Sequence, residues 1–144
     1  MKNPHIPRGR RGGFTLAEMM VVIVIIGLLA TLVVPNVIQR LSTAMGGKVK
    51  ADIVQIENAL NEYAIENAGK YPESLEALVT PDVRGHTFLN TTRIPRDPWK
   101  NEYMYDPPTP GQPKPRIYTY GKDGQPGGEG DDADIDSITI RDEG

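Results

Sequence analysis

An uncharged apolar run near the start of the chain restricts its fold more than any other feature. The run extends from Met19 to Val34, sixteen residues, and counting back to Phe14 lengthens the segment to 21 residues. A helix needs roughly 20 residues to cross ~30 Å of hydrocarbon. The run is too long for an ordinary secretory signal peptide, because Leu and Val continue directly after Ala30 and Thr31. We therefore expect a membrane-spanning helix, although a plain membrane anchor would show the same apolar pattern.

Glu18 is the single charged residue between positions 14 and 34. A carboxylate near the start of a membrane helix is costly and indicates a functional site. It requires a nearby cation, and this segment contains none. Cleavage of the chain immediately before Phe14 would create an α-amine that could supply the charge. Glu18 thus argues for a processed N-terminus and against both a simple signal peptide and a plain anchor.

The charge is divided unevenly along the chain. Residues 1–13 contain four basic residues and no acidic one, so the remaining 12 basic residues stand against 19 acidic ones, a balance of −7. Basic residues before an apolar segment predict a cytoplasmic N-terminus. Nucleic-acid binding is excluded as a function of the acidic remainder, because phosphate recognition requires clustered Lys and Arg. The chain has no cysteine, which excludes a disulfide and a thiolate metal site.

The residues at the start of the apolar run form a recognisable motif. The segment 13–23, GFTLAEMMVVI, resembles the type III signal of type IV pilins and pseudopilins. In that family a basic leader ends in Gly, a prepilin peptidase cuts after it, and the new N-terminal Phe is methylated. The resemblance implies cleavage between Gly13 and Phe14, N-methylation of Phe14, and a role in filament assembly for Glu18.

A second periodic segment follows the apolar run. Apolar residues recur there at spacings of four, three, four and three residues, which is one face of a helix: Val49, Ile53, Ile56, Leu60 and Tyr63. This stripe predicts a helix that runs from Phe14 to about Asn67, with a kink at Pro35. The expected divisions are a leader that is removed, 1–13; a membrane-spanning and filament-core helix, 14–35; its periplasmic half, 36–68; and a small head, 69–144.

The head is expected to complete an α+β fold in which the long helix packs against a small antiparallel sheet of about three strands. Gly69 and Pro72 end the long helix. A short helix is predicted over Pro72–Val79, with Leu75 and Leu78 facing inward. The predicted strands are 103–105, 117–120 and 135–140.

The segment 97–103, DPWKNEY, predicts a turn that places the only tryptophan in the small core. It also resembles the Asp-Pro-Trp-Gly-x-x-Tyr signature of the major pseudopilins of type II secretion systems, with Lys100 in the place of the usual Gly. Type IV pilins proper typically lack this block and close the C-terminal region with a disulfide. The absence of cysteine is therefore consistent with the pseudopilin resemblance.

The acidic, glycine-rich segment 123–134, DGQPGGEGDDAD, is the candidate metal site. Composition alone favours a solvated acidic tail over a site for Ca²⁺, which takes six to eight oxygen ligands. The resemblance to the calcium loop of major pseudopilins reverses that preference. It implies Asp123 and Asp134 as side-chain ligands and the carbonyl of Tyr120 as a backbone ligand. Further candidates are the backbone of Gln125 and the carboxylates of Asp131 and Asp132, either of which could replace or assist that of Asp134.

The resemblance implies a structural subunit of the type II secretion pseudopilus, which polymerises in the periplasm and drives export of folded proteins across the outer membrane. The implied partners are further copies of the chain, the prepilin peptidase, minor pseudopilins and the inner-membrane assembly platform. The chain is expected to cross the inner membrane once, with its head in the periplasm. The alternatives are the major pilin of a related type IV-like fibre, a minor pseudopilin, and a non-polymerising membrane-anchored calcium-binding module.

Enzymatic activity is not expected from the sequence. It contains no recognisable nucleophile–base pair and no histidine cluster with zinc-ligand spacing. Its two histidines, His5 and His86, lie far apart in polar context and are expected to be lone surface residues.

Overall fold

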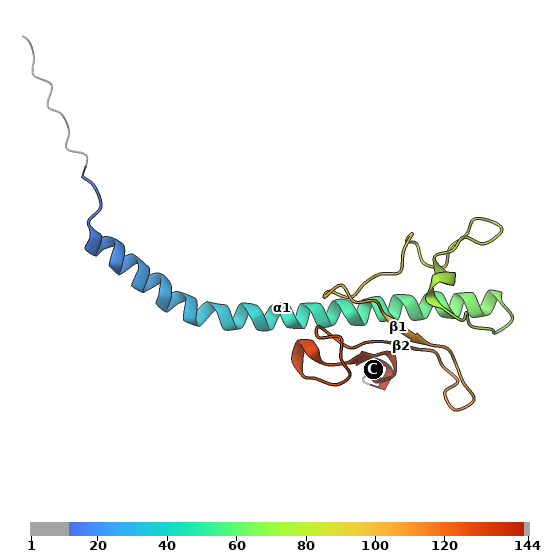
Figure 1. Ribbon diagram of the computed structural model, residues 1–144. Coiled ribbons are helices and arrows are strands. Elements are labelled where there is room, and N and C mark those ends of the chain that lie inside the picture. Colours follow the sequence, from blue (N-terminus) through green and yellow to red (C-terminus); the bar gives the residue numbers. More distant parts are fainter. Residues whose placement is uncertain (1–11, 143–144) are drawn as a thin grey trace, which may run out of the picture. The chain divides into compact units, whose positions relative to one another are not determined.

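The computed structural model describes residues 12–142 (Figure 1). The expected leader therefore lies outside the described residues, apart from Gly12 and Gly13. The chain divides into two compact units at Gln39–Arg40. Its elements, in order, are α1 (Leu16–Glu66), η1 (Leu75–Leu78), β1 (Met104–Asp106), β2 (Arg116–Thr119), η2 (Gly130–Asp132), β3 (Ile135–Asp136) and α2 (Ser137–Asp142).

The long helix α1 confirms the prediction of a helix from Phe14 to Asn67, with ends two residues later and one residue earlier. Pro35 lies inside α1 without ending it. Proline has no N–H to donate to the carbonyl four residues earlier, so the Thr31 carbonyl lacks its usual hydrogen bond within α1. The side-chain amide of the next residue, Asn36, donates to the carbonyl of Leu32 at 3.0 Å. The kink expected at Pro35 stays a prediction.

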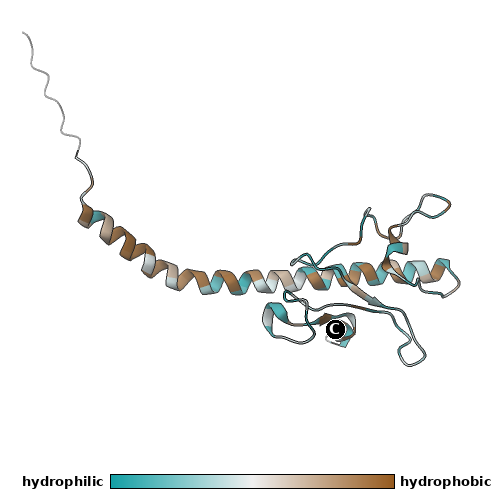
Figure 2. Cartoon of the chain, in the orientation of Figure 1, coloured by the Kyte–Doolittle hydropathy of each residue, from teal (hydrophilic) through white to brown (hydrophobic). Residues whose placement is uncertain are grey.

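The first part of α1 is apolar on all sides. Its large apolar side chains from Leu16 to Leu41 are between 40% and 79% exposed, and Figure 2 shows this part of the helix mostly brown, with paler and teal bands. It is long and apolar enough to cross a membrane, with a mean hydropathy of 2.8 over 18 residues. Because a helix apolar on every side is incompatible with water, this surface requires lipid or other helices around it.

The second part of α1 supplies the floor of the core in the unit from Arg40 onward. Four members of the predicted stripe are fully buried: Val49, Ile53, Ile56 and Leu60. Against them pack residues from η1, the loops and the sheet, namely Leu75, Leu78, Leu89, Tyr103 and Ile117. Tyr63 and Trp99 are half-buried and pack on the same cluster. The stripe and the inward direction of Leu75 and Leu78 are therefore confirmed.

The sheet has three antiparallel strands, as predicted, and their order is β1-β2-β3. Tyr105 faces Ile117 across β1 and β2, and Thr119 faces Ile135 across β2 and β3. In place of the helix predicted over Pro72–Val79 there is only the short 3₁₀ segment η1. Its Leu78 carbonyl accepts from the Leu89 N–H at 2.9 Å, which ties the segment to the following loop.

The predicted strand 135–140 is wrong beyond Asp136, where the chain turns into α2. One oxygen of Asp136, Oδ1, accepts from the Ile138 N–H at 2.7 Å and caps the new helix. The buried Ser137 hydroxyl accepts from the Ile117 N–H at 3.1 Å, so a side chain replaces the next backbone partner of β2. Arg141 then forms an ion pair with Glu57, which fixes α2 on α1.

The Asp97-Pro98-Trp99 turn is organised by a buried carboxylate. Asp97 is only 4% exposed. Its Oδ1 accepts from the N–H groups of Trp99 and Asn101 at 3.0 and 2.7 Å, and its Oδ2 accepts from the Thr119 hydroxyl at 2.7 Å. Lys100 closes the turn with φ of 77°, a left-handed conformation that glycine adopts without strain. The resemblance had marked this position as one where Gly is usual, and the backbone shows why.

We predict that Lys100→Gly stabilises the chain by about 1 kcal/mol. Relief of left-handed strain contributes ~1–2 kcal/mol, and the greater freedom of unfolded Gly offsets ~0.5–1 kcal/mol of it. Urea unfolding of the detergent-solubilised chain measures the change. The matched control is Lys114→Gly, at an exposed lysine without a positive φ, which should lower stability slightly. A loss of stability at both positions would contradict the assignment of strain to Lys100.

Candidate functional site

The start of α1 holds the residues implied in processing and assembly. Gly13 and Phe14 precede the helix, and the Phe14 side chain is 85% exposed. The Thr15 N–H donates to Glu18 Oε2 at 2.7 Å, and the Glu18 N–H donates to the Thr15 hydroxyl at 3.2 Å. This reciprocal pair is a capping box, which satisfies two N–H groups that a helix start leaves open.

The capping box was missed in the sequence, although its Thr-x-x-Glu signal is present at Thr15 and Glu18. It assigns Glu18 a local structural role alongside the assembly role that the resemblance implies. The capping bonds do not neutralise the carboxylate, and residues 12–39 contain no Lys or Arg. The negative charge therefore lies at the head of an apolar helix without a cation from its own segment.

The acidic loop begins at Gly121, where the backbone is crowded. Gly121 has φ of 72°, and a Cβ at this position would lie 2.7 and 2.8 Å from the carbonyl oxygens of Asp131 and Ala133. The N–H of Lys122 donates to the Asp131 carbonyl at 2.8 Å. The loop therefore closes at its base, and backbone oxygens gather where glycine leaves room for them.

The carboxylates of the loop are held by separate contacts. Asp123 Oδ1 accepts from the Gln125 N–H at 3.0 Å, and both oxygens of Asp134 accept from the Gly127 N–H at 3.0 Å. Asp131 accepts from the hydroxyl of Ser42, which attaches the loop to α1. Asp132 lies at the end of η2 and is half-buried.

The loop has the donor chemistry of a calcium site without showing its ligands assembled. All its candidate donors are carboxylate or carbonyl oxygens, which Ca²⁺ prefers. Among residues 12–142, however, no three carboxylates of this loop bring ligand oxygens within 4.8 Å of one another. Asp123 and Asp134 would thus have to act with backbone carbonyls, of which those of Asp131 and Ala133 lie at the base of the loop around Gly121.

The buried Asp97 connects its turn to this loop. The hydroxyl of Thr119 that donates to Asp97 also accepts from the Gly121 N–H at 3.3 Å. The side-chain amide of Asn101, from the same turn, donates to the Gly121 carbonyl at 2.7 Å. The two segments singled out in the sequence are therefore one hydrogen-bonded network, with Gly121 held on both sides.

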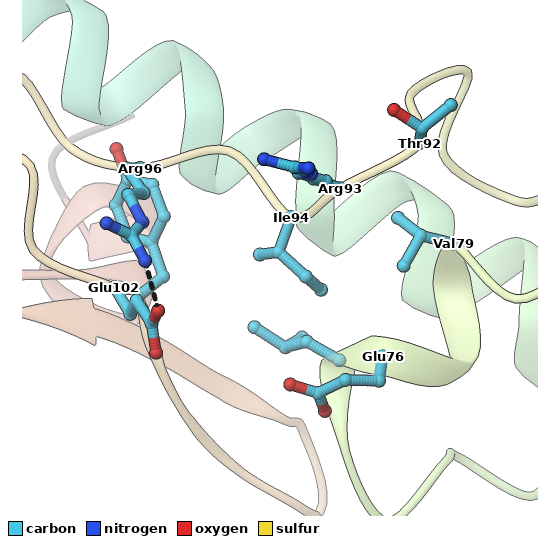
Figure 3. A pocket seen from close by; sticks show the side chains of 9 residues that line it. Glu76, Val79, Thr92, Arg93, Ile94, Arg96 and Glu102 are labelled. Carbon is cyan, nitrogen blue, oxygen red and sulfur yellow. Dashed lines mark hydrogen bonds and ion pairs between the residues drawn. The ribbon is translucent and has the colours of Figure 1, made fainter.

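A cavity of about 590 Å³ lies between η1 and the segment that leads into the Asp97 turn (Figure 3). Leu75, Val79 and Ile94 supply apolar side chains to its wall. At its edge Arg96 donates to Glu102 at 2.7 Å, as the dashed line in Figure 3 marks. Glu76, Arg93 and Tyr103 also line this cavity.

Comparison with known protein families identifies two matching segments. Residues 36–138 match the family described as type II secretion system, protein G, and residues 8–34 match the prokaryotic N-terminal methylation motif. A type II secretion system core protein G of Vibrio cholerae is 44% identical over 142 residues, which covers 92% of this chain and 95% of that protein. The corresponding protein of Pseudomonas aeruginosa is 41% identical over 138 residues, with coverages of 89% and 95%.

Among solved structures, the chain is similar to the major pseudopilin from the type 2 secretion system of enterohaemorrhagic Escherichia coli. The TM-score is 0.55 with 32% sequence identity, and the match covers 74% of this chain and 97% of that one. The long helix with a small three-stranded sheet is thus the fold of that pseudopilin.

Proposed function

The chain belongs to the type II secretion system protein G family, and we propose that it is the major structural subunit of a secretion pseudopilus. The observation that carries this proposal is the first part of α1, whose exposed apolar surface lies largely within the segment that matches the methylation motif. A segment of this kind, retained after processing, serves first as a membrane anchor and then as a filament core. The subunit polymerises in the periplasm, and growth of the filament drives folded proteins across the outer membrane.

Processing prepares the subunit for assembly. In this proposal the prepilin peptidase cuts between Gly13 and Phe14, and Phe14 becomes the methylated N-terminus. The chain crosses the inner membrane once, with the basic leader cytoplasmic and the unit from Arg40 onward periplasmic. Its partners are further copies of itself, the inner-membrane assembly platform and minor pseudopilins.

Glu18 guides the incoming subunit. Its capping bonds leave the charge in place. The α-amine of Phe14 in a neighbouring copy is a small cation that, like Glu18, stands at the start of the helical segment. In a medium of low dielectric constant such a pair attracts strongly, and an unpaired charge is correspondingly unfavourable. The pair thus favours one register between neighbouring helices.

Two substitutions separate the charge of Glu18 from its capping role. Glu18→Gln keeps a side-chain oxygen for the Thr15 N–H and removes the charge, whereas Thr15→Ala weakens the cap and keeps the charge. We predict that Glu18→Gln abolishes filament assembly and secretion of a reporter exoprotein, because loss of one partner of a buried pair costs about 3–5 kcal/mol. Thr15→Ala should secrete at near wild-type levels. Normal secretion by Glu18→Gln would show that the residue acts only as a cap.

We also propose that the loop 120–134 binds Ca²⁺. Asp123 and Asp134 supply side-chain oxygens, and Tyr120 and Gln125 supply backbone oxygens. Either Asp131 or Asp132 supplies a further carboxylate, which replaces or assists that of Asp134. When bound, the ion would neutralise these carboxylates and link the two ends of the loop. The closed base at Gly121 and the all-oxygen donor set support this proposal, and the ion would brace a unit that has no disulfide.

Calcium should raise the melting temperature of the chain in detergent, measured against the same sample in chelator. Binding stabilises the folded state by about 2.7 kcal/mol at a hundred times the dissociation constant. We predict that Asp123→Ala and Asp134→Ala lose this calcium increment and that Asp142→Ala keeps it. Asp136 does not serve as a control, because it pairs with Arg116 at 2.5 Å and caps α2. Equal melting with calcium and chelator would assign the loop to a solvated acidic segment.

A further inference from the structure

A mixed cluster of one histidine and two carboxylates lies at the end of α1, in the unit from Arg40 onward. Glu66 is in the last turn of α1, and Asp82 and His86 are in the loop after η1. One ligand atom from each residue lies within 4.8 Å of those of the other two. His86, expected from the sequence to be a lone surface residue, is therefore brought beside two acids. The sequence separations of 16 and 4 residues carry no recognised metal-binding pattern.

The loop that carries Asp82 and His86 is closed by its own backbone. The Asp82 N–H donates to the His86 carbonyl at 2.9 Å, and the Gly85 N–H donates to the Asp82 carbonyl at 3.0 Å. The N–H groups of Arg84 and His86 both donate to Asp82 Oδ1 at 2.8 Å. These bonds fix the position of the Asp82 carboxylate within the loop.

Two aromatic contacts orient the imidazole toward α1. The rings of His86 and Phe88 meet edge to face with centroids 5.3 Å apart, and those of Phe88 and Tyr63 do the same at 5.1 Å. Tyr63 lies on α1 one turn before Glu66, so the three rings lead from the helix to the loop. Edge-to-face contacts are a favoured geometry for aromatic rings and help to hold the imidazole in place.

The proposed ligand atoms are largely free of hydrogen bonds and ion pairs within residues 12–142. Within residues 12–142, neither the Glu66 carboxylate nor the His86 ring takes part in a hydrogen bond or ion pair, and Asp82 uses only one of its oxygens. Glu66 and Asp82 also border an open depression of about 790 Å³, through which a hydrated ion has access.

We propose that Glu66, Asp82 and His86 form a binding site for a divalent transition-metal ion of the Zn²⁺ class. A neutral imidazole with two carboxylates and one water makes the four-coordinate donor set that Zn²⁺ takes at open sites. The imidazole distinguishes this site from the all-oxygen acidic loop, since Ca²⁺ and Mg²⁺ prefer oxygen ligands. The bound ion ties the loop 82–86 to the end of α1, and the proposal is independent of the one made for calcium.

Arg84 limits the affinity of the site. Arg84 lies in the loop between Asp82 and His86, and its positive charge repels a divalent cation. Arg84→Gln should therefore tighten metal binding several-fold, an effect that a purely structural role of the cluster does not predict.

The test is titration of the full detergent-solubilised chain with ZnCl₂ and, for its absorption spectrum, with CoCl₂. Saturating CaCl₂ is present throughout, which occupies the acidic loop if that loop binds calcium. One equivalent of Zn²⁺ should bind, and Co²⁺ should show the intense visible bands of four-coordinate geometry. His86→Ala should weaken binding by at least about 100-fold, since loss of even an outer-shell partner costs roughly 10–100-fold. Glu66→Gln, at an exposed helix position, should weaken it as well.

Two matched variants control the experiment. Glu62→Gln lies one turn earlier on the exposed surface of α1, and His5→Ala removes the other histidine of the chain. Both should bind Zn²⁺ as the unmodified chain does. Unchanged binding in His86→Ala and Glu66→Gln, or no saturable binding in the unmodified chain, would overturn the proposal. Loss of binding in His5→Ala alone would do the same, because it would place the ion on the leader.

Discussion

The buried stripe of α1 is the constraint on which the rest of the unit from Arg40 onward depends. The strands of the sheet are three, four and two residues long, and a sheet this small does not hold together in water by itself. The fully buried side chains of Val49, Ile53, Ile56 and Leu60 offer it a continuous apolar floor. Each short element is therefore stable because it places one or two apolar residues on that floor.

Polar contacts then fix the short elements where the apolar core is too small to do so. Asp97 accepts three hydrogen bonds while nearly fully buried, and hydrogen bonds to a charged group contribute about 1.5–3 kcal/mol each. Through Thr119 and Asn101 these bonds reach Gly121 and the base of the acidic loop. The buried turn and the proposed calcium loop thus stabilise each other, and any change in the Asp97 turn is expected to alter the loop.

The parts of the fold with strong local patterns could be predicted from the sequence. The spacing from Val49 to Tyr63 predicted the buried face of α1, and the predicted strands 103–105 and 117–120 lie within one residue of β1 and β2. The end of the last strand could not be predicted, because Ile135 to Ile140 has the β-branched composition of a strand. Capping of α2 by Asp136 and burial of the Ser137 hydroxyl against β2 outweigh that propensity. The first depends on a single capping side chain, and the second on a contact between residues twenty positions apart.

The candidate sites also divide into those with a local sequence pattern and those without one. The processing motif is contiguous, so Gly13, Phe14 and Glu18 could be selected from the sequence, and only the capping role of Glu18 was overlooked. The association of Glu66 with His86 is a tertiary contact between residues 20 positions apart and has no sequence signal.

The central claim is that the apolar part of α1 remains in the mature protein behind a new N-terminus at Phe14. Intact-mass spectrometry of the chain isolated from membranes tests it most directly, with cells that lack prepilin peptidase as the comparison. The account predicts a mature chain of 131 residues, 144 minus 13, that begins with methylated Phe14 when the peptidase is present, and the unprocessed chain when it is not. A chain that still begins at Met1 in cells with active peptidase, or one that has lost the apolar segment, would contradict it.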